Sequence, residues 1–504
     1  MSDEFLDLLK LAAVLVAVVL LLLFIALFGV IKGVLKFVLW TEPRVLGPNG
    51  ALGPSKVHRL PGSRFAFIRM IFDGGVEQLF RDMSSDGNGQ VYPPLVCVGG
   101  DFTAQPYVYV FDADAVRDIL TQHRFFAKQP ATYDVLAPLL GRGLVLSAGD
   151  LWRRQRKLLT PLFHFVKLRA YTQIENDEAA RLVDVLAAKC GQNVEPIPLF
   201  ASCMQRIVMR AVFSDHRFDL EEMAALWDTV NDAFRPWILA VTFLPLPVAR
   251  LVPGAVSRAF RCIDRVRDLI GAAVDAARAS EDGPCDDIVG QMAQLSIDRE
   301  LIVDECVTFL FAGRDTVSHT MGFVLYFLAQ NAGVQEELLR EVESVCGSDA
   351  VDDAAINALK LHGCVVRETL RLRPSLPNLI RVVSAPEGVT LAGVHIPQDT
   401  IVTVGAFGIQ RAREHWGEDS CEFRPARWLE ESQRARHPFS WLPFNAGTRS
   451  CIGKSLAVNA TTVMLAHIVR RFKIVGDVGH VTTAFTGTFG PVGLDRIRFI
   501  ERSP

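Results

Sequence analysis

The chain has 504 residues, and half of them are apolar. A mean hydropathy of +0.24 excludes a disordered or fibrous protein and is high for an ordinary soluble enzyme. The formal net charge of −3 gives no basic field of the kind that nucleic-acid-binding proteins carry. Ten cysteines without a Cys-x-x-Cys pair indicate a reduced, cytosol-facing setting rather than a disulfide scaffold.

The first predicted element is a membrane-spanning helix over residues 11–31. This run is uncharged and almost wholly apolar, and a helix of its length crosses a bilayer core of about 30 Å. Its preceding flank is acidic, whereas Lys32, Lys36 and Trp40 follow it, which places the remaining chain in the cytosol. A cleaved signal peptide is the alternative, but the run is too long for one and the first residues are acidic. We therefore expect residues 1–40 to be a single-pass anchor, in the endoplasmic reticulum membrane.

Residues 41–63 are rich in proline and glycine, which predicts a hinge. Residues 64–504 show no repeat and no second linker of this kind, so we expect one large domain. Apolar residues at helical spacing predict helices near 112–122, 152–159, 175–190, 218–233, 255–280, 298–329, 333–345, 354–373 and 453–471. Short β-branched segments predict strands near 107–111, 389–396 and 400–405, with a further pair within 472–500. The predicted fold class is mainly α with small β-sheets.

The long predicted helix over residues 298–329 has an unusual centre. Gly313, Asp315 and Thr316 interrupt an otherwise apolar run, and such local conflict is expected at functional sites. The threonine hydroxyl can bond the carbonyl of Ala312, four residues earlier, and open the helix. The alternative is a kinked, buried helix in which Asp315 forms a surface salt bridge.

Two residue pairs fall on single helix faces. Trp152 and Arg156 are four residues apart, and Glu368 and Arg371 are three apart, so each pair can meet. By themselves both are compatible with solvated surface positions, because exposed pairs of this kind are common and weak.

The strongest pattern is Phe444-x-x-Gly447-x-Arg449-x-Cys451-x-Gly453. An apolar helix follows it directly, which puts the sulfur at a helix N-terminus, where backbone N–H groups and the helix dipole stabilise a thiolate. Both glycines would let the backbone approach a flat ligand. A thiolate with such donors and no partner cysteine suits an axial haem ligand. A buried structural cysteine in a turn is the alternative reading of a lone cysteine.

With this motif the chain resembles the cytochrome P450 family of haem-thiolate monooxygenases, from the hinge to the last residue. The resemblance implies the P450-like fold, haem b as cofactor with Cys451 as the iron ligand, and O2 as co-substrate. It also implies electrons from NADPH, delivered by a flavoprotein reductase in the same membrane, because the chain has no dinucleotide or Walker motif of its own. The family member that binds haem covalently through a glutamate would carry it at Ala312, so non-covalent haem is expected.

The resemblance also implies roles for single residues. Thr316 and Asp315 would be catalytic, handling protons and bound oxygen opposite the thiolate. The buried pair of Glu368 and Arg371 would be completed by Arg427 and hold the core on the haem side. The cofactor-binding set, which includes the side chains that contact the haem propionates, would be Trp152, Arg156, Arg381, Phe444, Gly447, Arg449 and Gly453.

Two local resemblances bear on the substrate. Residues 149–165 resemble the animal fatty-acid ω-hydroxylases, and the segments Ala312–Thr316 and Phe444–Gly447 resemble plant and yeast ω-hydroxylases. A long-chain fatty acid or related lipid is therefore the expected substrate, a small apolar molecule rather than a nucleic acid. Sterol, terpenoid or xenobiotic hydroxylation, a peroxide-using isomerase of the family, and a haem-binding membrane protein without turnover are the alternatives. Pocket positions expected from the resemblance are Tyr133, Phe309, Ala312, Leu376 and Phe485.

Overall fold

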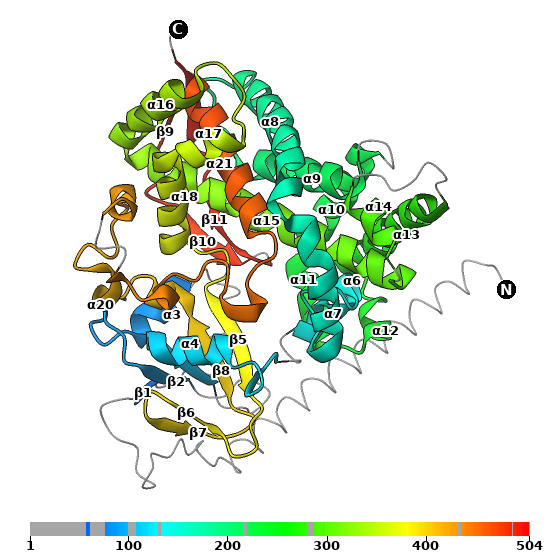
Figure 1. Ribbon diagram of the computed structural model, residues 1–504, viewed down its shortest axis with the longest axis vertical. Coiled ribbons are helices and arrows are strands. Elements are labelled where there is room, and N and C mark those ends of the chain that lie inside the picture. The colour runs from blue at the N-terminus through cyan, green and yellow to red at the C-terminus, as the bar shows by residue number, and fades with distance from the viewer. Residues whose placement is uncertain are drawn as a thin grey trace, which may run out of the picture.

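The computed structural model describes residues 57–60, 76–98, 107–129, 133–214, 219–279, 287–295, 297–430, 435–485 and 487–502 (Figure 1). The predicted anchor at 1–40 lies outside these ranges, as does most of the predicted hinge at 41–63. Within the described ranges, no helix combines the length and the apolar character that a membrane crossing requires.

A six-stranded mixed sheet forms one side of the molecule, at the lower left of Figure 1. Its strands run in the order β1-β2-β3-β8-β5-β4. Their bounds are β1 Val57–Leu60, β2 Leu95–Val98, β3 Tyr107–Val110, β4 Phe126–Ala127, β5 Asn378–Val383 and β8 Ile401–Gly405. The pairs β1–β2 and β3–β8 are parallel, and the other neighbours are antiparallel. Because β8 and β5 come almost 300 residues after β3, the sheet joins the two ends of the domain.

Three two-stranded sheets complete the β-structure. Each is antiparallel, and two of them pair segments that are close in sequence. Their strands are β6 Val389–Leu391 with β7 Val394–Ile396, β10 Thr482–Phe485 with β11 Phe489–Val492, and β9 Phe472–Gly476 with β12 Ile497–Glu501.

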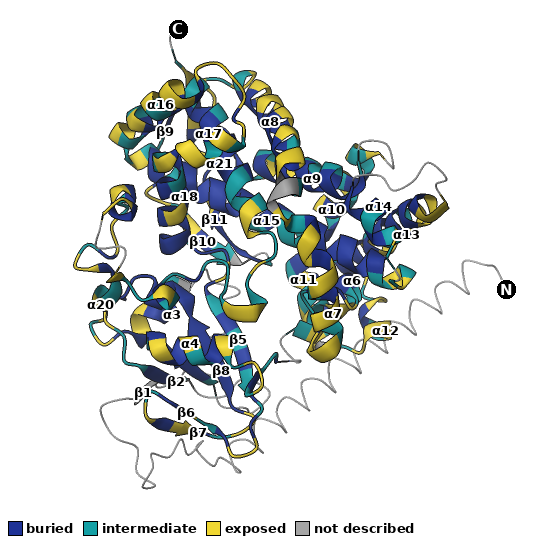
Figure 2. Cartoon of the chain, viewed as in Figure 1, coloured by how far each residue is buried: buried dark blue, intermediate teal, exposed yellow. Residues whose placement is uncertain are grey.

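Helices make up the rest of the molecule and enclose the main apolar core (Figures 1 and 2). The helices before the centre of the chain are α3 Val76–Met83, α4 Ala113–Thr121, α6 Ala137–Leu140, α7 Gly149–Leu159, α8 Phe165–Ala187, α9 Ile197–Phe213, α10 Leu220–Asp232, α11 Phe234–Phe243 and α12 Leu246–Ala249. Those after it are α13 Ala255–Ala279, α14 Ile288–Ala293, α15 Arg299–Gln330, α16 Ala332–Cys346, α17 Asp353–Ala358, α18 Lys360–Leu372, α19 Ala406–Ile409, α20 Arg413–Trp416 and α21 Lys454–Arg471. Short 3-10 turns are η2 Asp134–Leu136, η3 Thr160–Phe163, η4 Pro425–Trp428, η6 Pro438–Ser440 and η7 Gly447–Arg449.

Helix α15 is the central element, and its 32 residues are mostly buried (Figure 2). It packs most extensively on α9. A Cβ on Gly313 would lie 2.7 Å from a methyl carbon of Val208 in α9, so the glycine in the middle of α15 permits close contact between the two helices. The apolar run that predicted a long helix is therefore a core element that is buried on nearly every side.

The predicted elements agree with the structure in most places. The expected mainly helical fold with small sheets is present, and α15 and α21 lie within a residue or two of their predicted bounds. The segment 354–373 is two helices, α17 and α18, rather than one. Helix α8 begins ten residues earlier than predicted. Helix α9 and strand β5 were not predicted, and both contact the cavity described next.

Candidate functional site

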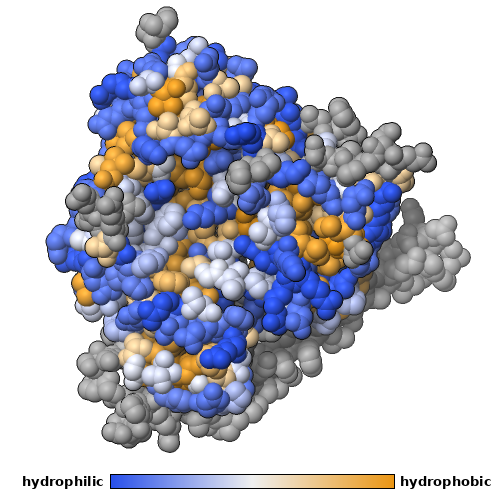
Figure 3. Space-filling model, viewed as in Figure 1, coloured by the Kyte–Doolittle hydropathy of each residue, from blue (hydrophilic) through white to orange (hydrophobic). Residues whose placement is uncertain are grey.

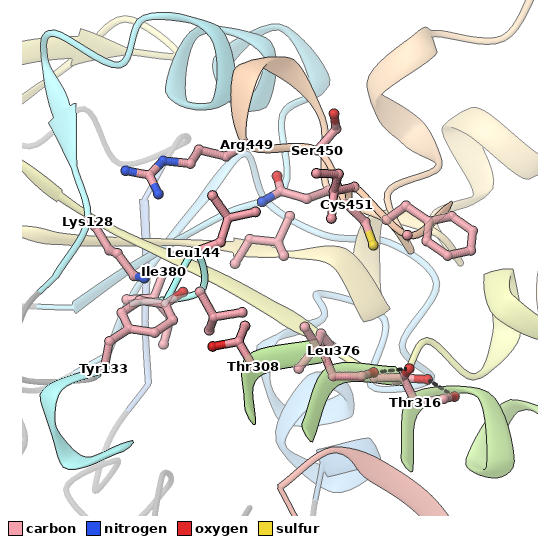
Figure 4. Close-up of a pocket in the computed structure, with 18 of the residues that line it drawn as sticks. Lys128, Tyr133, Leu144, Thr308, Thr316, Leu376, Ile380, Arg449, Ser450 and Cys451 are labelled. Atoms are coloured by element: carbon pink, nitrogen blue, oxygen red, sulfur yellow. Dashed lines mark hydrogen bonds between the residues drawn. The ribbon is translucent and has the colours of Figure 1, made fainter. Parts of the chain in front are cut away.

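A cavity of about 1300 Å³ lies beside the middle of α15. Its walls come from α15, α7, β5, the segment after β4 and the loop before α21 (Figure 4). Figure 3 shows apolar side chains gathered in the middle of one face of the molecule, between hydrophilic regions. Of the residues singled out in the sequence, the cavity is lined by Tyr133, Trp152, Arg156, Phe309, Ala312, Thr316, Leu376, Arg381, Phe444, Arg449, Cys451 and Gly453.

Cys451 lies three residues before the first residue of α21, and it is exposed on the side of the cavity. Its backbone N–H donates to the carbonyl of Phe444 at 2.8 Å, which closes the loop. Burial raises the pKa of the thiol, whereas the backbone N–H of Gly453 and the charges of Arg156 and Lys454 act in the opposite direction. The sulfur therefore has around it the donors and cations that favour a thiolate.

The two glycines of the cysteine motif have different surroundings. Gly453 lines the cavity, and the space where a Cβ would stand is open. Gly447 does not line the cavity. Its φ is +66°, and a Cβ there would lie 2.2 Å from the carbonyl oxygen of Leu120 in α4. The sequence predicts that Gly447 lets the backbone approach a flat ligand, but in the structure this glycine permits a left-handed turn and close packing of the loop on α4.

Thr316 lies on the cavity side of α15. Its hydroxyl donates to the carbonyl of Ala312 at 2.7 Å, the backward bond expected from the sequence. The carbonyl of Thr316 in turn accepts from Ser375 Oγ at 3.0 Å and from Thr320 Oγ1 at 2.7 Å. These hydroxyl groups form a polar stretch in a mostly apolar wall, and Ser375 and Thr320 were not foreseen from the sequence.

Asp315 is turned away from the cavity, although it neighbours Thr316 in sequence. Its Oδ1 accepts from Arg314 Nη1 at 2.8 Å. The same guanidinium donates to Gln205 Oε1 at 3.0 Å and forms an ion pair with Asp228, whose side chain is 58% exposed. Asp315 thus belongs to a mostly buried charge network that reaches the surface at α10. This is neither the surface salt bridge of the alternative nor a direct contact with Thr316.

Five arginines line the cavity, and three of them, Arg156, Arg381 and Arg449, are the ones expected at the haem propionates. None of these three forms an ion pair with an acidic residue in the described part of the chain. Arg156 and Arg449 each donate one hydrogen bond to a backbone carbonyl, at 2.8 and 2.9 Å, and Arg449 lies 4.0 Å over the ring of Trp152. Burial and the neighbouring Arg381 lower the pKa of Arg449 to about 10. The guanidinium groups therefore form a positive wall that lacks a counter-ion.

A further cation of the cavity wall, Lys128, was not predicted from the sequence. It follows β4 in an irregular segment, lines the cavity, and has its Nζ 4.1 Å from the ring centroid of Tyr133. Burial lowers its pKa to about 7, and the charges of Arg449 and Arg381 add to this effect, while Asp134 opposes it. An isolated lysine after a two-residue strand carries no periodic or motif signal, so nothing in the sequence distinguished it from a surface residue.

The triad of Glu368, Arg371 and Arg427 is assembled and fully buried. Arg371 forms two hydrogen bonds to the carboxylate, at 2.9 and 2.8 Å, and Arg427 Nε adds a third at 2.8 Å. Although burial opposes ionisation, these partners hold the pKa of Glu368 below its ordinary value. Trp428 Nε1 and the backbone N–H of Arg424 also donate to this carboxylate, and neither contact was foreseen.

Of the five predicted pocket positions, four line the cavity: Tyr133, Phe309, Ala312 and Leu376. The fifth, Phe485, ends β10, and its side chain lies outside the described part of the structure. Val208 and Met204 of α9 and Ile380 of β5 also line the cavity. The sequence did not indicate them because the elements that carry them were missed.

The residues present fit a haem. A porphyrin needs an axial ligand, apolar contacts for its faces and cationic partners for two carboxylates. Cys451 provides a sulfur exposed to the cavity, and apolar side chains of α15 and α21 provide the walls. Guanidinium groups without acidic partners lie in the same cavity, which is the arrangement that buried carboxylates require.

Comparisons with known proteins agree with this geometry. The sequence model of the family described as Cytochrome P450 matches residues 91–485. "Probable cytochrome P450 4ac2" of Drosophila melanogaster is 27% identical over 466 residues, covering 87% of this chain and 88% of that protein. "Cytochrome P450 4V2" of Rattus norvegicus is 30% identical over 400 residues (73% and 75%), and "Cytochrome P450 734A4" of Oryza sativa subsp. japonica is 30% identical over 420 residues (76% and 77%).

A solved structure shows the same fold. The crystal structure of the "cytochrome P450DA heme domain" superimposes with a TM-score of 0.77 at 20% sequence identity, covering 89% of this chain and 98% of that one. The family match covers most of the chain, and the cavity presents the residues that the family's chemistry needs. The chain therefore belongs to the cytochrome P450 family of haem-thiolate monooxygenases.

Proposed function

We propose that this monooxygenase hydroxylates a C–H bond of a long-chain fatty acid or a related lipid. The observation that carries the proposal is the cavity of about 1300 Å³ beside Cys451, whose walls are mainly apolar. Burying a methylene group from water there would contribute roughly 0.8 kcal/mol. A polar substrate would instead lose hydrogen bonds that these walls cannot replace. The resemblance of residues 149–165 to the animal fatty-acid ω-hydroxylases supports the same substrate class.

Members of the family bind haem b non-covalently, and we assign its partners in this chain. The bound haem supplies the iron at which O2 is activated with NADPH-derived electrons, so that one oxygen atom enters the substrate C–H bond. Cys451 would supply the thiolate, and Ala312 offers no carboxyl group for a covalent link to the porphyrin. The propionates would be held by Trp152, Arg156, Arg381 and Arg449, since arginine offers a planar fork to a carboxylate.

Thr316 and Asp315 would move protons. The Thr316 hydroxyl lies at the cavity and can exchange its bond to Ala312 for a bond to a water in the cavity. Asp315 would reach the same groove only by leaving Arg314, and Asp228 offers that guanidinium a second carboxylate. The exposed position of Asp228 supports a route for protons from solvent to the middle of α15.

The electrons come from a separate reductase, because the chain carries no nucleotide-binding motif. We propose that it docks on the surface formed by α7 and the start of α21, beside the loop that carries Cys451. Exposed basic residues of these two helices are Arg153, which also lines the cavity, Arg154, Lys157 and Lys454. Such a surface would attract an acidic partner.

We further propose that residues 1–40 anchor the enzyme in a membrane, with residues 64–504 as the catalytic domain on the cytosolic side. The support is the apolar run 11–31, with its acidic flank before and basic flank after. A lipid substrate dissolved in the same bilayer would be concentrated beside the enzyme. The endoplasmic reticulum is the proposed membrane because the family's reductase works from the same bilayer.

The first test is a carbon-monoxide difference spectrum of the reduced holoenzyme. The wild type should give the Soret band of thiolate-ligated haem, and Cys451→Ala should lose it. Cys421→Ala is the matched control, because Cys421 is exposed and does not line the cavity; its band should be unchanged. A wild-type band that persists in Cys451→Ala would overturn the assigned ligand.

The second test addresses the substrate class. Purified enzyme, reductase and NADPH are incubated with fatty acids of different length, alkanes, sterols and terpenoids, and products are identified by mass spectrometry. Hydroxylated fatty acids or alkanes support the proposal. Products from sterols or terpenoids alone would replace it with a different substrate class in the same cavity.

A further inference from the structure

We propose that His319 of α15 is a positioning residue for specificity. It holds the segment 487–489, which leads into β11, as a fixed wall of the cavity, and thereby decides which carbon of the substrate lies beside Thr316. His319 is not among the described residues that line the cavity, so it acts through this segment and not on the substrate. The inference rests on the monooxygenase reaction and applies to any apolar substrate that fills the cavity.

One hydrogen bond joins His319 to the segment. Nδ1 of its ring lies 2.8 Å from Oγ1 of Thr488, and both side chains are buried. Burial lowers the pKa of His319, while Asp315 opposes this effect and Arg314 adds to it. A neutral imidazole has one nitrogen that donates and one that accepts, and a hydroxyl does either, so the bond forms with each tautomer. Removal of one partner would leave a buried polar atom of the other without this bond, which costs free energy.

The ring of His319 also lies directly against β11. A Cβ on Gly490 would lie 2.4 Å from Cδ2 of His319, and a Cβ on Gly322 would lie 2.8 Å from Cγ of Pro491. One glycine of the strand and one of the helix thus allow β11 to rest on α15 over a full helical turn. Packing fixes the strand on the helix, and the hydrogen bond fixes the segment just before it.

The neighbours of Thr488 form part of the cavity wall. Gly487 and Phe489 both line the cavity, whereas Thr488 between them is bonded to His319. Gly487 has a φ of +95°, and a Cβ there would lie 3.5 Å from the ring of Phe234 in α11. The segment therefore contacts α15 through Thr488 and faces α11 at Gly487, so its position sets the width of the cavity at this place.

A second contact ties the segment to the same part of α15. The backbone N–H of Phe489 donates to the carbonyl of Ser375 at 2.9 Å, and Ser375 Oγ donates to the carbonyl of Thr316 at 3.0 Å. His319 follows Thr316 by three residues, which is about one helical turn. Both contacts fix the wall at Phe489 relative to the place where Thr316 faces the cavity. A shift of this wall would change which carbon of a flexible chain reaches that place.

The experiment compares His319→Leu, Thr488→Val and the double variant with wild type, each as holoenzyme with reductase and NADPH. The substrate is dodecanoic acid, and the measurement is the ratio of product hydroxylated at the terminal carbon to product hydroxylated at the carbons before it. Each single variant should change this ratio by about 3- to 10-fold, the effect of one hydrogen bond. The double variant should change it no further, because both substitutions remove the same bond.

Two matched variants serve as controls. His319→Asn places an amide atom where Nδ1 of the ring stands, so it should restore most of the wild-type ratio. Thr462→Val removes a buried hydroxyl that bonds within α21 and should behave like wild type. A ratio in His319→Leu and Thr488→Val equal to that of wild type would overturn the proposal.

Hydrogen exchange gives a readout that does not depend on the substrate. In the two single variants the amides of residues 487–492 should exchange about 3- to 10-fold faster than in wild type, since one hydrogen bond that closes this segment is lost. The amides of β12, which pairs with β9 in a different sheet, should exchange as in wild type. Equal acceleration in both segments would mean a general loss of stability, and no acceleration would mean that His319 does not hold the segment; each result contradicts the proposal.

The failure of this inference differs from the failure of the proposed substrate class. If wild type and both single variants hydroxylate dodecanoic acid with one product ratio, His319 does not position the wall and the substrate class stands. If wild type gives no product from dodecanoic acid, the fatty-acid class is wrong. The ratio is then measured on the sterol or terpenoid that wild type hydroxylates, and the exchange of residues 487–492 tests His319 in either case.

Discussion

The hydroxyl of Thr316 has two roles: it forms a hydrogen bond within α15, and it is proposed to transfer a proton in the cavity. Its bond to the carbonyl of Ala312 satisfies the hydroxyl within α15, although bonds of this kind loosen a helix locally, and it must open when the hydroxyl handles a proton in the cavity. Ser375 and Thr320 donate to the carbonyl of Thr316, which holds this turn of the helix in place while the hydroxyl changes partner.

Thr316→Ala should separate oxygen consumption from product formation. Without the hydroxyl, proton transfer loses its carrier at the cavity, so more O2 should be released as hydrogen peroxide. We expect coupling to fall several-fold, measured as product formed per NADPH oxidised, while the carbon-monoxide band is retained. Thr316→Ser keeps the hydroxyl and should restore most of the coupling. Equal coupling in wild type and Thr316→Ala would remove Thr316 from the mechanism.

The role of a residue can be predicted from local sequence when its surroundings are formed by residues that are close to it in the chain. Cys451 is such a residue, because its glycines and the helix that follows are contiguous with it. Lys128 is not, because Arg449 and Arg381, which add to the effect of burial in lowering its pKa, come from segments over 250 residues away. For the same reason Asp315 was predicted in the groove, whereas Arg314, Gln205 and Asp228 hold it on the other side of α15.

The contact between α15 and the loop after α6 is tight enough to require glycine. A Cβ on Gly143 would lie 2.0 Å from Thr308 Oγ1 and 2.8 Å from a backbone oxygen of α15. Glu305 holds the same loop, accepting from the backbone N–H of Leu144 at 2.9 Å and from Gln155 of α7 at 2.7 Å. One carboxyl group thus joins α15, α7 and the loop that lines the cavity.

This junction should make stability depend on pH. Burial is the main cause that raises the pKa of Glu305 to about 8, from an ordinary value of 4.5, and Asp304 adds to it. The folded state therefore resists ionisation that the unfolded chain undergoes, and stability is lost as pH rises from about 4.5 to about 8, by up to about 1.4 kcal/mol per pH unit.

Glu305→Gln should remove that pH dependence. The amide keeps the shape but only one of the two hydrogen bonds, so the variant should be less stable than wild type at pH 5, by about 1 kcal/mol. Toward pH 8 the order should reverse. Urea unfolding followed by circular dichroism at pH 5, 6.5 and 8 checks this, with Glu300→Gln, an exposed position on the same helix, as control. Parallel pH profiles for wild type and Glu305→Gln would contradict the assigned ionisation.

Most of the predicted helices have one polar face, although α15 was located from its long apolar run and is buried on nearly every side. The helices α13 and α16 have such faces and were located from the sequence. Helix α9 was missed although its apolar residues recur as regularly as those of α16; most of its residues are buried. Strand β5 was missed because it follows Pro377 and carries Asn378 and Arg381, polar residues that serve the cavity rather than the strand.

The whole molecule combines a sheet from both ends of the domain with a helical body around α15. Its fold class followed from the balance of helical and strand-like segments, but the order of the six strands did not, because pairs such as β3 with β8 join distant parts of the chain. The membrane-spanning helix remains a sequence prediction, since residues 11–31 lie outside the described structure.

Deletion of residues 1–40 should release the enzyme from the membrane. In fractionated cells the full chain is expected in the membrane pellet after a high-salt wash, and the shortened chain in the supernatant with its carbon-monoxide band intact. Deletion of residues 1–9 leaves the apolar run whole and should remain in the pellet. A shortened chain (residues 41–504) that stays in the pellet would show that other parts of the protein suffice for membrane attachment.

The cations around the cavity also affect how the protein folds. In the haem-free chain like charges at Lys128, Arg156, Arg381 and Arg449 repel one another, and each is partly removed from water. A bound ligand with two negative charges would turn this repulsion into a net attraction. Any ligand that binds only the folded state also adds stability in proportion to the logarithm of its concentration over its Kd. The amount of folded enzyme in a cell should therefore follow the supply of porphyrin as well as the rate of synthesis.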